Sequence, residues 1–393
     1  MLDGIRIVSF NHFLMGPFGI QHLADLGADV IALEPVGGAW QRKWGGGNRK
    51  VDGESVLFLA ANRNKRSLSI NLKSPEGLDI AKKLIRTADV VSENYRPGVM
   101  KAFGLDYESV KAIKPDIIYA SASGYGQTGP YVDRPGQDLL IQAMSGIAAI
   151  TGTEAGARTV GVSAVDHHGA ALLAMGILAA IVRKQRTGQG GHVDVSLLQA
   201  AIDLQMESFT TYLNGPKPKS IRQPAHVGGW YYGSPYGIYK ARDGELVISL
   251  TPLPLLSKVL EIPELAAMDA NAWFERREEI ATLVQQKVGT RTRAEWFELF
   301  EKSEVWYAPV NDYEDVLKDP QVRHNEAFMT LKSATGSDIT LVRHPVRFDG
   351  KGRDVTLPPQ KLGAQTAEVL REIGYSDAEI DRLAQAKVVE KAG

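Results

Sequence analysis

The residues with the clearest chemical potential stand around an aspartate, in the run Val165-Asp166-His167-His168-Gly169 directly before an apolar stretch over residues 170–182. An aspartate just before a helix satisfies free backbone N–H groups and complements the helix dipole. The same carboxylate, held against an activated acyl group in a site that excludes water, is a nucleophile. His167 and His168 can likewise be interpreted in two ways. They are either ordinary polar residues at the start of a helix or groups that shape a pocket beside Asp166.

Three polar segments that contain glycine precede Asp166 and extend the pattern. They are Ser92-Glu93-Asn94-Tyr95-Arg96-Pro97-Gly98, Gly124-Tyr125-Gly126-Gln127-Thr128-Gly129-Pro130 and Arg134-Pro135-Gly136-Gln137-Asp138. Glycines in such segments suit a site where the backbone approaches a ligand closely. The Gly124 to Pro130 segment, taken singly, could equally be a cluster of structural turns between a strand and a helix.

In this order the segments resemble the class III coenzyme A (CoA) transferases, a family that includes formyl-CoA transferase and carnitine CoA-transferase and shares its fold with α-methylacyl-CoA racemase. The resemblance extends from Met15-Gly16-Pro17 to Pro345-Val346-Arg347-Phe348 and is densest before Ala200. It implies that Asp166 carries the acyl group and that Asp138 lies near it, and we assign Gln137 to the same catalytic site. It also implies that acyl-CoA is a substrate, with no tightly bound cofactor and no metal.

The resemblance predicts which residues contact CoA and the acyl group. The CoA contacts would be Arg63, Lys65, Arg66, Ile70, Lys73, Asn94, Tyr95, Arg96, Lys101, Gly124 and Tyr125. Lysine and arginine suit the 3′-phosphate and the pyrophosphate of CoA, although any one of them could instead belong to a solvated surface. The substrate contacts, chosen by position and by aromatic or cationic character, would be Phe13, Leu14, Trp40, Arg42, Trp44, His167, His168, Trp230 and Tyr231. Arg42 or Arg134 could pair with the distal carboxylate of a dicarboxylate such as succinate.

The predicted activity is transfer of CoA from an acyl-CoA donor to a free carboxylic acid. An aspartate that attacks a thioester forms an anhydride, and the released thiolate converts this anhydride to an aspartyl-CoA thioester. The acceptor carboxylate then reverses the exchange. Because every intermediate stays activated, the reaction requires positioning and exclusion of water rather than ATP or a metal.

Three alternatives accompany this prediction. The racemase uses the matching aspartate with a histidine in a Gly-His-Asp run, where this chain has Gly136-Gln137-Asp138, and glutamine exchanges no proton near neutral pH. A dinucleotide-dependent oxidoreductase would show Gly-x-Gly-x-x-Gly after the first strand, where this chain reads Asn11-His12-Phe13-Leu14-Met15-Gly16-Pro17. A CoA-binding protein without catalytic activity is the third.

The chain departs from the family pattern at three places. Pro35 stands where some members have a basic residue, and Ala102, next to Lys101, replaces another. Formyl-CoA transferase also has a glycine-rich loop in its small domain, and the nearest candidates here are residues 228–233 and 251–254, neither of which resembles it. These departures argue against formyl-CoA and oxalate as substrates.

Composition excludes several classes of function. The 393 residues carry a formal net charge of -1, which gives no general attraction to nucleic acid or to an anionic membrane. The absence of cysteine excludes disulfides and thiolate nucleophiles. The N-terminus lacks a signal-peptide pattern, and the apolar run over residues 164–182 is interrupted by three polar residues and is shorter than a membrane span. We therefore expect a soluble cytoplasmic protein.

The order of elements predicts an α/β fold with a parallel sheet. Residues 5–10, 29–34, 89–92 and 116–120 have the composition of strands, and helices are expected after Gly16-Pro17 and Ser74-Pro75. After Gly169 we expect a buried hairpin of two long helices, the first ending near Arg186 and the second over residues 195–213. Later segments predict two strands over 238–250, a strand at 339–342, and helices at 366–373 and 377–386.

This pattern predicts a large CoA-binding α/β domain at residues 1–213, a linker at 214–229 and a smaller α+β domain at 230–330. A C-terminal segment, residues 331–393, is expected to return to the large domain. The resemblance implies that the large domain is Rossmann-like, that the C-terminal segment completes its sheet, and that two chains form an interlocked homodimer. The expected partners are acyl-CoA, a small carboxylic acid and a second copy of the chain, with neither nucleic acid nor membrane.

Overall fold

A central sheet organises much of the chain in the computed structural model, which describes residues 1–269 and 271–392. In spatial order its strands are β14 (Val389–Glu390), β5 (Lys65–Ile70), β2 (Asp29–Glu34), β1 (Arg6–Phe10), β6 (Val90–Glu93), β7 (Ile118–Ser123) and β8 (Gly191–Ser196). All neighbours are parallel except β14, which pairs antiparallel with β5. The predicted α/β fold with a mostly parallel sheet is confirmed.

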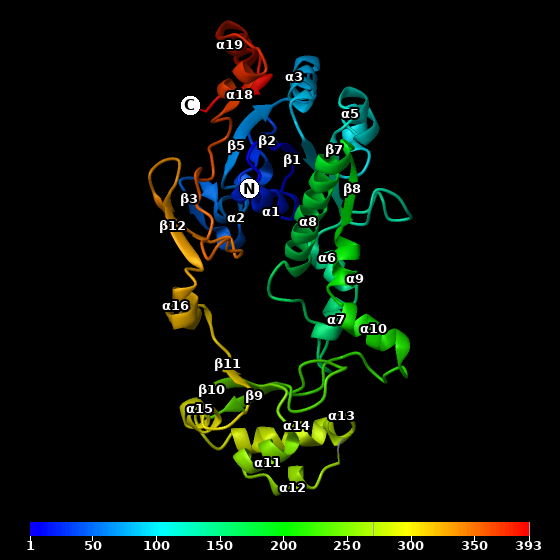
Figure 1. Ribbon diagram of the computed structural model, residues 1–393, viewed down its shortest axis with the longest axis vertical. Coiled ribbons are helices and arrows are strands. Elements are labelled where there is room, and N and C mark those ends of the chain that lie inside the picture. The colour runs from blue at the N-terminus through cyan, green and yellow to red at the C-terminus, as the bar shows by residue number, and fades with distance from the viewer. Residues whose placement is uncertain (270, 393) are drawn as a thin grey trace. The chain divides into compact units, whose positions relative to one another are not determined.

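Helices cover both faces of this sheet. Val8, Phe10 and Ile31 share a buried cluster with apolar residues of α3 (Pro75–Arg86), α5 (Tyr107–Ile113), α18 (Thr366–Glu372) and α19 (Asp377–Gln385). Alternate residues such as Ile7 face the other side, because successive side chains of a strand point in opposite directions. There α1 (Met15–Asp25) and α8 (Ala164–Thr187) pack against each other. Figure 1 shows the C-terminal helices beside β5 and β2.

The structure corrects two expectations about α8 and the segment after it. The helix begins at Ala164 and has 24 residues, so Asp166, His167 and His168 lie in its first turns. Among the described residues it is the one helix that could cross a membrane by length and composition, although Leu173 and Ile177 are buried as in a core helix. The predicted helical hairpin is wrong, because residues 191–196 form β8 and only then do α9 (Leu197–Asp203) and α10 (Met206–Asn214) follow.

The chain divides into two compact units. The first comprises Met1–Ile141, Ser163–Leu204 and Arg323–Gly393, and the second comprises Gln142–Val162 and Gln205–Val322. The first unit holds the central sheet and the hairpin of β12 (Phe328–Lys332) and β13 (Asp338–Val342). The second unit has an antiparallel sheet of β9 (Gly237–Ala241), β10 (Gly244–Ile248) and β11 (Tyr307–Pro309), and a core that includes Trp296 and Phe300.

Candidate functional site

The strand order places a crevice beside β1. From β1 the chain moves outward through β2 to β5, and then returns to add β6 on the other side of β1. In open α/β sheets ligands bind outside the carboxyl ends of the strands at such a switch point. Here the two loops are joined by Asn94, whose Oδ1 accepts the His12 backbone N–H at 2.8 Å and whose Nδ2 donates to the His12 carbonyl at 2.8 Å.

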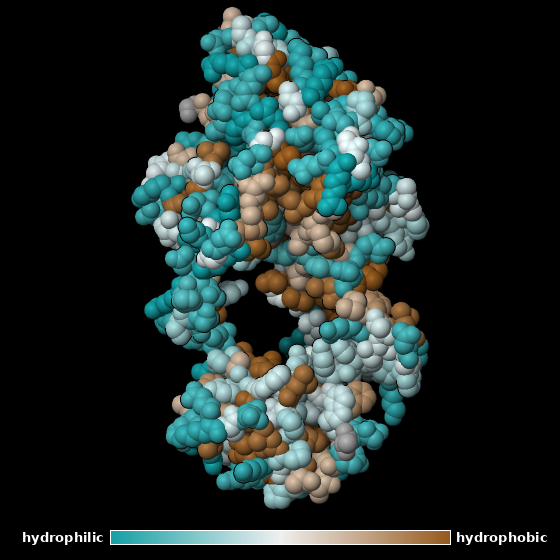
Figure 2. Space-filling view, in the orientation of Figure 1, coloured by the Kyte–Doolittle hydropathy of each residue, from teal (hydrophilic) through white to brown (hydrophobic). Residues whose placement is uncertain are grey.

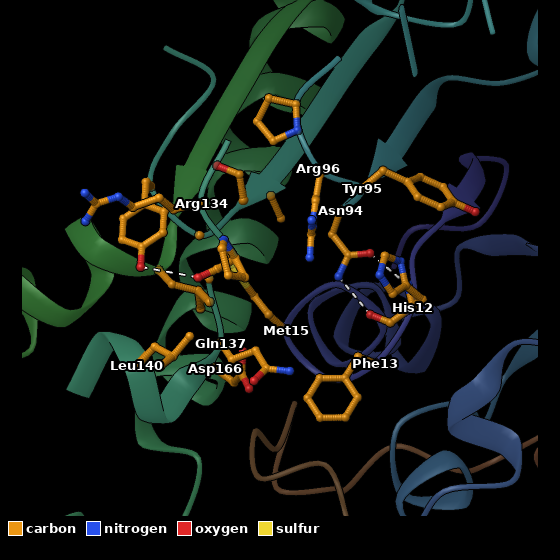
Figure 3. A pocket seen from close by; sticks show the side chains of 18 of the residues that line it. His12, Phe13, Met15, Asn94, Tyr95, Arg96, Arg134, Gln137, Leu140 and Asp166 are labelled. Carbon is orange, nitrogen blue, oxygen red and sulfur yellow. Dashed lines mark hydrogen bonds between the residues drawn. The ribbon is translucent and has the colours of Figure 1, made fainter. Parts of the chain in front are cut away.

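A cavity of about 380 Å³ lies at this edge of the sheet, entirely within the first unit. We call it the site cavity. Its walls bring together many of the residues predicted from the sequence: Phe13, Leu14, Trp40, Asn94, Tyr95, Arg96, Gly124, Tyr125, Arg134, Gln137 and Asp166. Figure 3 shows Asp166, Gln137 and Phe13 facing the same space.

The carboxylate of Asp166 is buried in the wall of this cavity, with 4% of the residue exposed. Burial, and secondarily the charge of Asp138, raises the pKa of Asp166 to about 7. A carboxylate that has lost its hydration is both more basic and more reactive toward a carbon electrophile. The site therefore holds a carboxylate that changes protonation state near neutral pH.

Asp138 caps the helix that carries Asp166. It begins α6 (Asp138–Met144) and is itself buried, and its Oδ2 accepts the backbone N–H groups of Val165 at 2.8 Å and of Asp166 at 3.0 Å. Ser163, at the N-cap position of α8, makes no side-chain hydrogen bond to the helix. The capping carboxylate is thus Asp138, while Asp166 lies at the third helical position.

Two glycines allow the segment before Asp138 to reach the site. A Cβ on Gly124 would lie 2.6 Å from the Cα of Gly136, and a Cβ on Gly136 would lie 2.4 Å from the Cα of Gly124. Both distances are far below van der Waals contact, so any side chain at either position would separate the two backbones. The end of β7 and the segment that leads to Gln137 can therefore touch only because both residues are glycine.

An aromatic cluster forms another wall. The Phe13 ring stacks on Trp40 with centroids 5.0 Å apart and lies 5.5 Å from the Trp44 ring. Phe13 has φ of 67°, a left-handed conformation that costs a residue with a Cβ on the order of 1–3 kcal/mol. Both tryptophans are about half exposed. The strained backbone keeps the phenyl ring at the cavity, next to an apolar surface suited to an acyl chain or pantetheine.

Two of the predicted basic residues form ion pairs with buried carboxylates of the protein itself. Arg42 is buried and binds Glu34 through Nε and Nη2, at 2.7 and 2.6 Å. Arg63 is buried and binds Asp25 in the same bidentate manner, and its Nη1 donates to the Val342 carbonyl at 2.8 Å. The structure does not bring either guanidinium to the site cavity.

Lys65 and Arg66 also face partners within the protein. The buried Lys65 amine donates to the carbonyls of Pro17 and Ala61, both at 2.7 Å, and burial lowers the pKa of Lys65 to about 7. Arg66 binds Asp29 and Glu372 on the first unit. These two residues hold the start of α1 and the C-terminal helix α18 rather than line the site cavity.

The remaining predicted residues lie in other surroundings. The His167 ring packs against Phe18 at 5.0 Å, and His168 Nε2 lies 2.7 Å from Asp203 Oδ2. Lys101, together with Arg96, lines a separate cavity of about 330 Å³ in the first unit. Trp230 and Tyr231 belong to the second unit and bond to Ser208 and Glu207 of the same unit.

A second large cavity, of about 490 Å³, contains two further predicted CoA contacts, Ile70 and Lys73. It opens at the carboxyl ends of β2 and β5, where Pro35 and Val36 follow β2. Tyr95 lines both this cavity and the site cavity. The two cavities therefore share one side chain of their walls.

Sequence reasoning missed two titratable residues near the ends of β1 and β6, His12 in the site cavity and Glu93 in the smaller cavity that Lys101 lines. His12 lines the site cavity, its buried Nδ1 has no hydrogen-bond partner in the described part of the chain, and burial lowers its pKa. Glu93, buried beneath the loop, accepts the Tyr95 backbone N–H at 3.0 Å, and burial raises its pKa to about 7. Both could have been identified from the rule that ligands bind at the carboxyl ends of the strands where the strand order reverses, because His12 follows β1 and Glu93 ends β6. Over the described residues no group of three metal-ligating His, Asp or Glu side chains occurs.

Comparison with known proteins gives a consistent result. The family model of CoA-transferase family III matches residues 2–366. Succinyl-CoA:glutarate CoA-transferase of Mus musculus is 35% identical over 99% of this chain and 90% of its own length. Succinate--glutarate CoA-transferase of Agrobacterium fabrum is 34% identical over 95% of each chain. The crystal structure of a CAIB/BAIF family protein from Brucella suis covers 95% of this chain and 99% of its own, with 31% identity and a TM-score of 0.81.

Proposed function

The chain belongs to CoA-transferase family III, and we propose that it moves CoA between two carboxylic acids through covalent bonds to Asp166. The observation that carries this proposal is the buried carboxylate of Asp166 in the wall of the site cavity, with the capping role filled by Asp138. Burial of a carboxylate costs free energy, because its charge loses hydration. A role of Asp166 as the nucleophile accounts for its burial.

The reaction proceeds in four steps. Each step is an attack on the carbonyl carbon of the acyl group or on that of Asp166. An oxygen of Asp166 attacks the thioester carbonyl, and the C–S bond breaks to release CoA thiolate and leave an anhydride. The thiolate attacks the aspartyl carbonyl, and the donor acid leaves as its carboxylate. The acceptor carboxylate then attacks the aspartyl-CoA thioester and expels the thiolate. Finally the thiolate attacks the acceptor carbonyl of the new anhydride, which releases the product acyl-CoA and restores Asp166.

The start of α1 supports the developing negative charge in this proposal. Leu14, at its N-cap position, makes no side-chain hydrogen bond to the helix, and Leu14 and Met15 both line the site cavity. The N-terminal N–H groups of a helix and its dipole favour an anionic oxygen. We therefore assign the first turn of α1 to the tetrahedral oxyanion formed at each attack.

The two adjoining cavities account for the length of CoA. Lys73 and Ile70 would receive the adenosine end in the second cavity, and the pantetheine arm would pass Tyr95 into the site cavity toward Asp166. Asn94 would act indirectly, because both polar atoms of its side chain are used to fix the loop after β1.

The rate of acylation should depend on pH near neutrality. Because the pKa of Asp166 is raised to about 7, lowering the pH below this value protonates the nucleophile. We expect kcat/KM for the acyl-CoA donor to fall about tenfold per unit well below pH 7 and to level off above it. Asp138→Asn removes the neighbouring negative charge and should shift this limb to lower pH. Thiolate release measured by stopped flow across the range tests this, and a flat profile down to about pH 5 would contradict the assignment.

The substrates we propose are short dicarboxylic acids. The two relatives named above are named for succinyl-CoA or succinate and for glutarate. Of the two arginines predicted to bind a distal carboxylate, Arg42 is paired with Glu34, whereas Arg134 lines the site cavity with its guanidinium 4.0 Å from the centroid of the Tyr131 ring. Of these two arginines, Arg134 is the one that lines the site cavity, and we assign it to the second carboxylate.

We expect Arg134→Gln to raise the KM for glutarate about tenfold, as loss of one hydrogen bond to a charged group does, and to leave the KM for pentanoate within about twofold. Arg371→Gln, at an exposed arginine of α18 paired with Asp377, is the control. Initial rates with succinyl-CoA as donor give both constants. An equal increase for the two acceptors would show that Arg134 does not distinguish the distal carboxylate.

The direct test of the function is an exchange assay. Purified protein with succinyl-CoA and glutarate should yield glutaryl-CoA and succinate in equal amounts without ATP.

The alternative activity is that of the racemase. Gln137, at the position of the racemase histidine, lines the site cavity together with Asp166. Failure to exchange with any four- or five-carbon dicarboxylate, combined with deuterium wash-in at the α-carbon of 2-methylacyl-CoA, would replace the proposal with the racemase.

We further propose that two chains associate as an interlocked homodimer. Met175 and Val182 of α8 and Ile202 of α9 are exposed by 60%, 44% and 39%. Figure 2 shows apolar side chains gathered on the first unit around α8. Apolar side chains that are exposed together on one surface indicate an interaction site, and a second copy of this chain is the proposed occupant. Light scattering of the purified protein distinguishes a dimer from a monomer.

A further inference from the structure

The second cavity has a wall that comes from the end of the chain. Lys387 lines it together with Lys73, although the first lies near the C-terminus and the second follows β5. Two hydrogen bonds fix this wall. The Asn71 backbone N–H donates to the Val388 carbonyl at 2.8 Å, and the Gly37 N–H donates to Glu390 Oε2 at 2.7 Å. The C-terminal segment is thereby attached to the loops after both β5 and β2.

Lys387 has a backbone conformation that its side chain does not favour. Its φ is 55°, in the left-handed region, and it follows Ala386, the C-cap residue of α19, just before β14. Helices commonly end with a residue in this conformation, and that residue is usually glycine because a Cβ is disfavoured there. A lysine at this position causes backbone strain that a glycine would avoid. The feature that distinguishes lysine from glycine here is its amine, so we look for the role of the residue in that group.

The charges that line the cavity are few. They are those of Glu34, Lys73 and Lys387, and Glu34 is already paired with Arg42. Pro35, which also lines the cavity, cannot bind an anion. The two lysines therefore make the cavity cationic, and a phosphate monoester is a ligand group suited to two ammonium groups that line one cavity.

We propose that Lys387 binds the 3′-phosphate of CoA together with Lys73, so that the C-terminal segment is part of the substrate site. This inference rests on the proposed function, since it takes CoA as the ligand of the second cavity. It supplies the cation that Pro35 and Ala102 do not provide. It also makes the docking of the chain end a requirement for tight CoA binding.

Calorimetric titration of the full-length protein with CoA and with 3′-dephospho-CoA tests the proposal. Lys387→Gln should raise the Kd for CoA about tenfold and leave the Kd for 3′-dephospho-CoA within about twofold. Lys387→Gly should reproduce this loss without lowering Tm, because glycine tolerates the left-handed backbone. The control is Lys391→Gln, at a lysine of the same segment whose amine binds Asp381 instead.

Two results would overturn the inference while leaving the proposed function in place: an unchanged Kd for CoA in both Lys387 variants, or an equal loss for CoA and 3′-dephospho-CoA. The first would remove Lys387 from the site, and the second would assign it to another part of CoA. If the unaltered protein bound no CoA at all, the proposed function and this inference would both be wrong.

Discussion

Asp166→Ala is expected to reduce kcat for CoA transfer by at least about 10⁴-fold, the scale of loss seen when a nucleophile is removed from a covalent catalyst. The carboxylate is buried in the wall of the site cavity, and each proposed step makes or breaks a bond to it. Removing it also removes a desolvated charge, so the variant should fold at least as stably as the unaltered protein. Steady-state formation of glutaryl-CoA from succinyl-CoA, with a thermal melt of each variant, measures both effects.

Two matched variants sharpen this test. Asp166→Asn keeps the size of the side chain but cannot form the anhydride, and it should be as inactive as Asp166→Ala. Asp203→Asn alters an exposed acid that is paired with His168 in the same unit and should retain full activity. Substantial transfer by Asp166→Asn would mean that Asp166 serves only as a polar or structural group and that the covalent route is wrong.

Asp138→Ala is expected to be the most harmful substitution outside the nucleophile. The Asp138 carboxylate accepts two backbone N–H groups at the start of α8, and its removal leaves both buried donors without this acceptor. We expect a loss of about 2–3 kcal/mol in the free energy of unfolding, from the cap and the unsatisfied groups together. The start of α8 also positions Asp166, so kcat should fall about 10²-fold.

Asp138→Asn separates these two roles. Its amide oxygen can still accept the N–H groups, so stability should largely return. Burial still raises the pKa of Asp166, but the smaller contribution from the charge of Asp138 is gone. Denaturant unfolding and the pH profile of kcat/KM measure the two effects independently. If Asp138→Ala matched the unaltered protein in both stability and kcat, Asp138 would not be the residue that holds α8 in place.

Four strands of the central sheet, β1, β2, β6 and β7, were predicted from the sequence, whereas β5 and β8 were not. β1, β2, β6 and β7 contain continuous apolar or β-branched runs because they are buried on both faces. β8 lies at the edge of the sheet and alternates half-buried and exposed residues before its last position. Its sequence continues directly into the helix formers of α9, so the strand was included in a helix that was predicted too long.

The residues of the site that belong to recognisable backbone segments were predictable from the sequence. The positions of the basic side chains were not, because they depend on carboxylates that are distant in the sequence. Asn94 directly follows β6, Gln137 follows the closely packed Gly136, and Asp166 lies in the first turn of α8, and all three line one cavity. For the basic residues, charge type does not reveal which carboxylate lies opposite. Arg63 pairs with Asp25 across 38 residues and Arg66 with Glu372 across 306, and no local pattern reports such contacts. The shared cavity of Lys387 and Lys73 is likewise a long-range arrangement that no local pattern reports.

Intact-protein mass spectrometry tests the central claim most directly. The unaltered protein and Asp166→Ala would each be incubated with succinyl-CoA and with a panel of other acyl-CoAs, with hydroxylamine trapping in parallel. We expect a covalent adduct only in the unaltered protein, with the hydroxamate mapped by peptide sequencing to Asp166. No adduct with any donor, or an adduct of equal yield in Asp166→Ala, would contradict a mechanism through that aspartate.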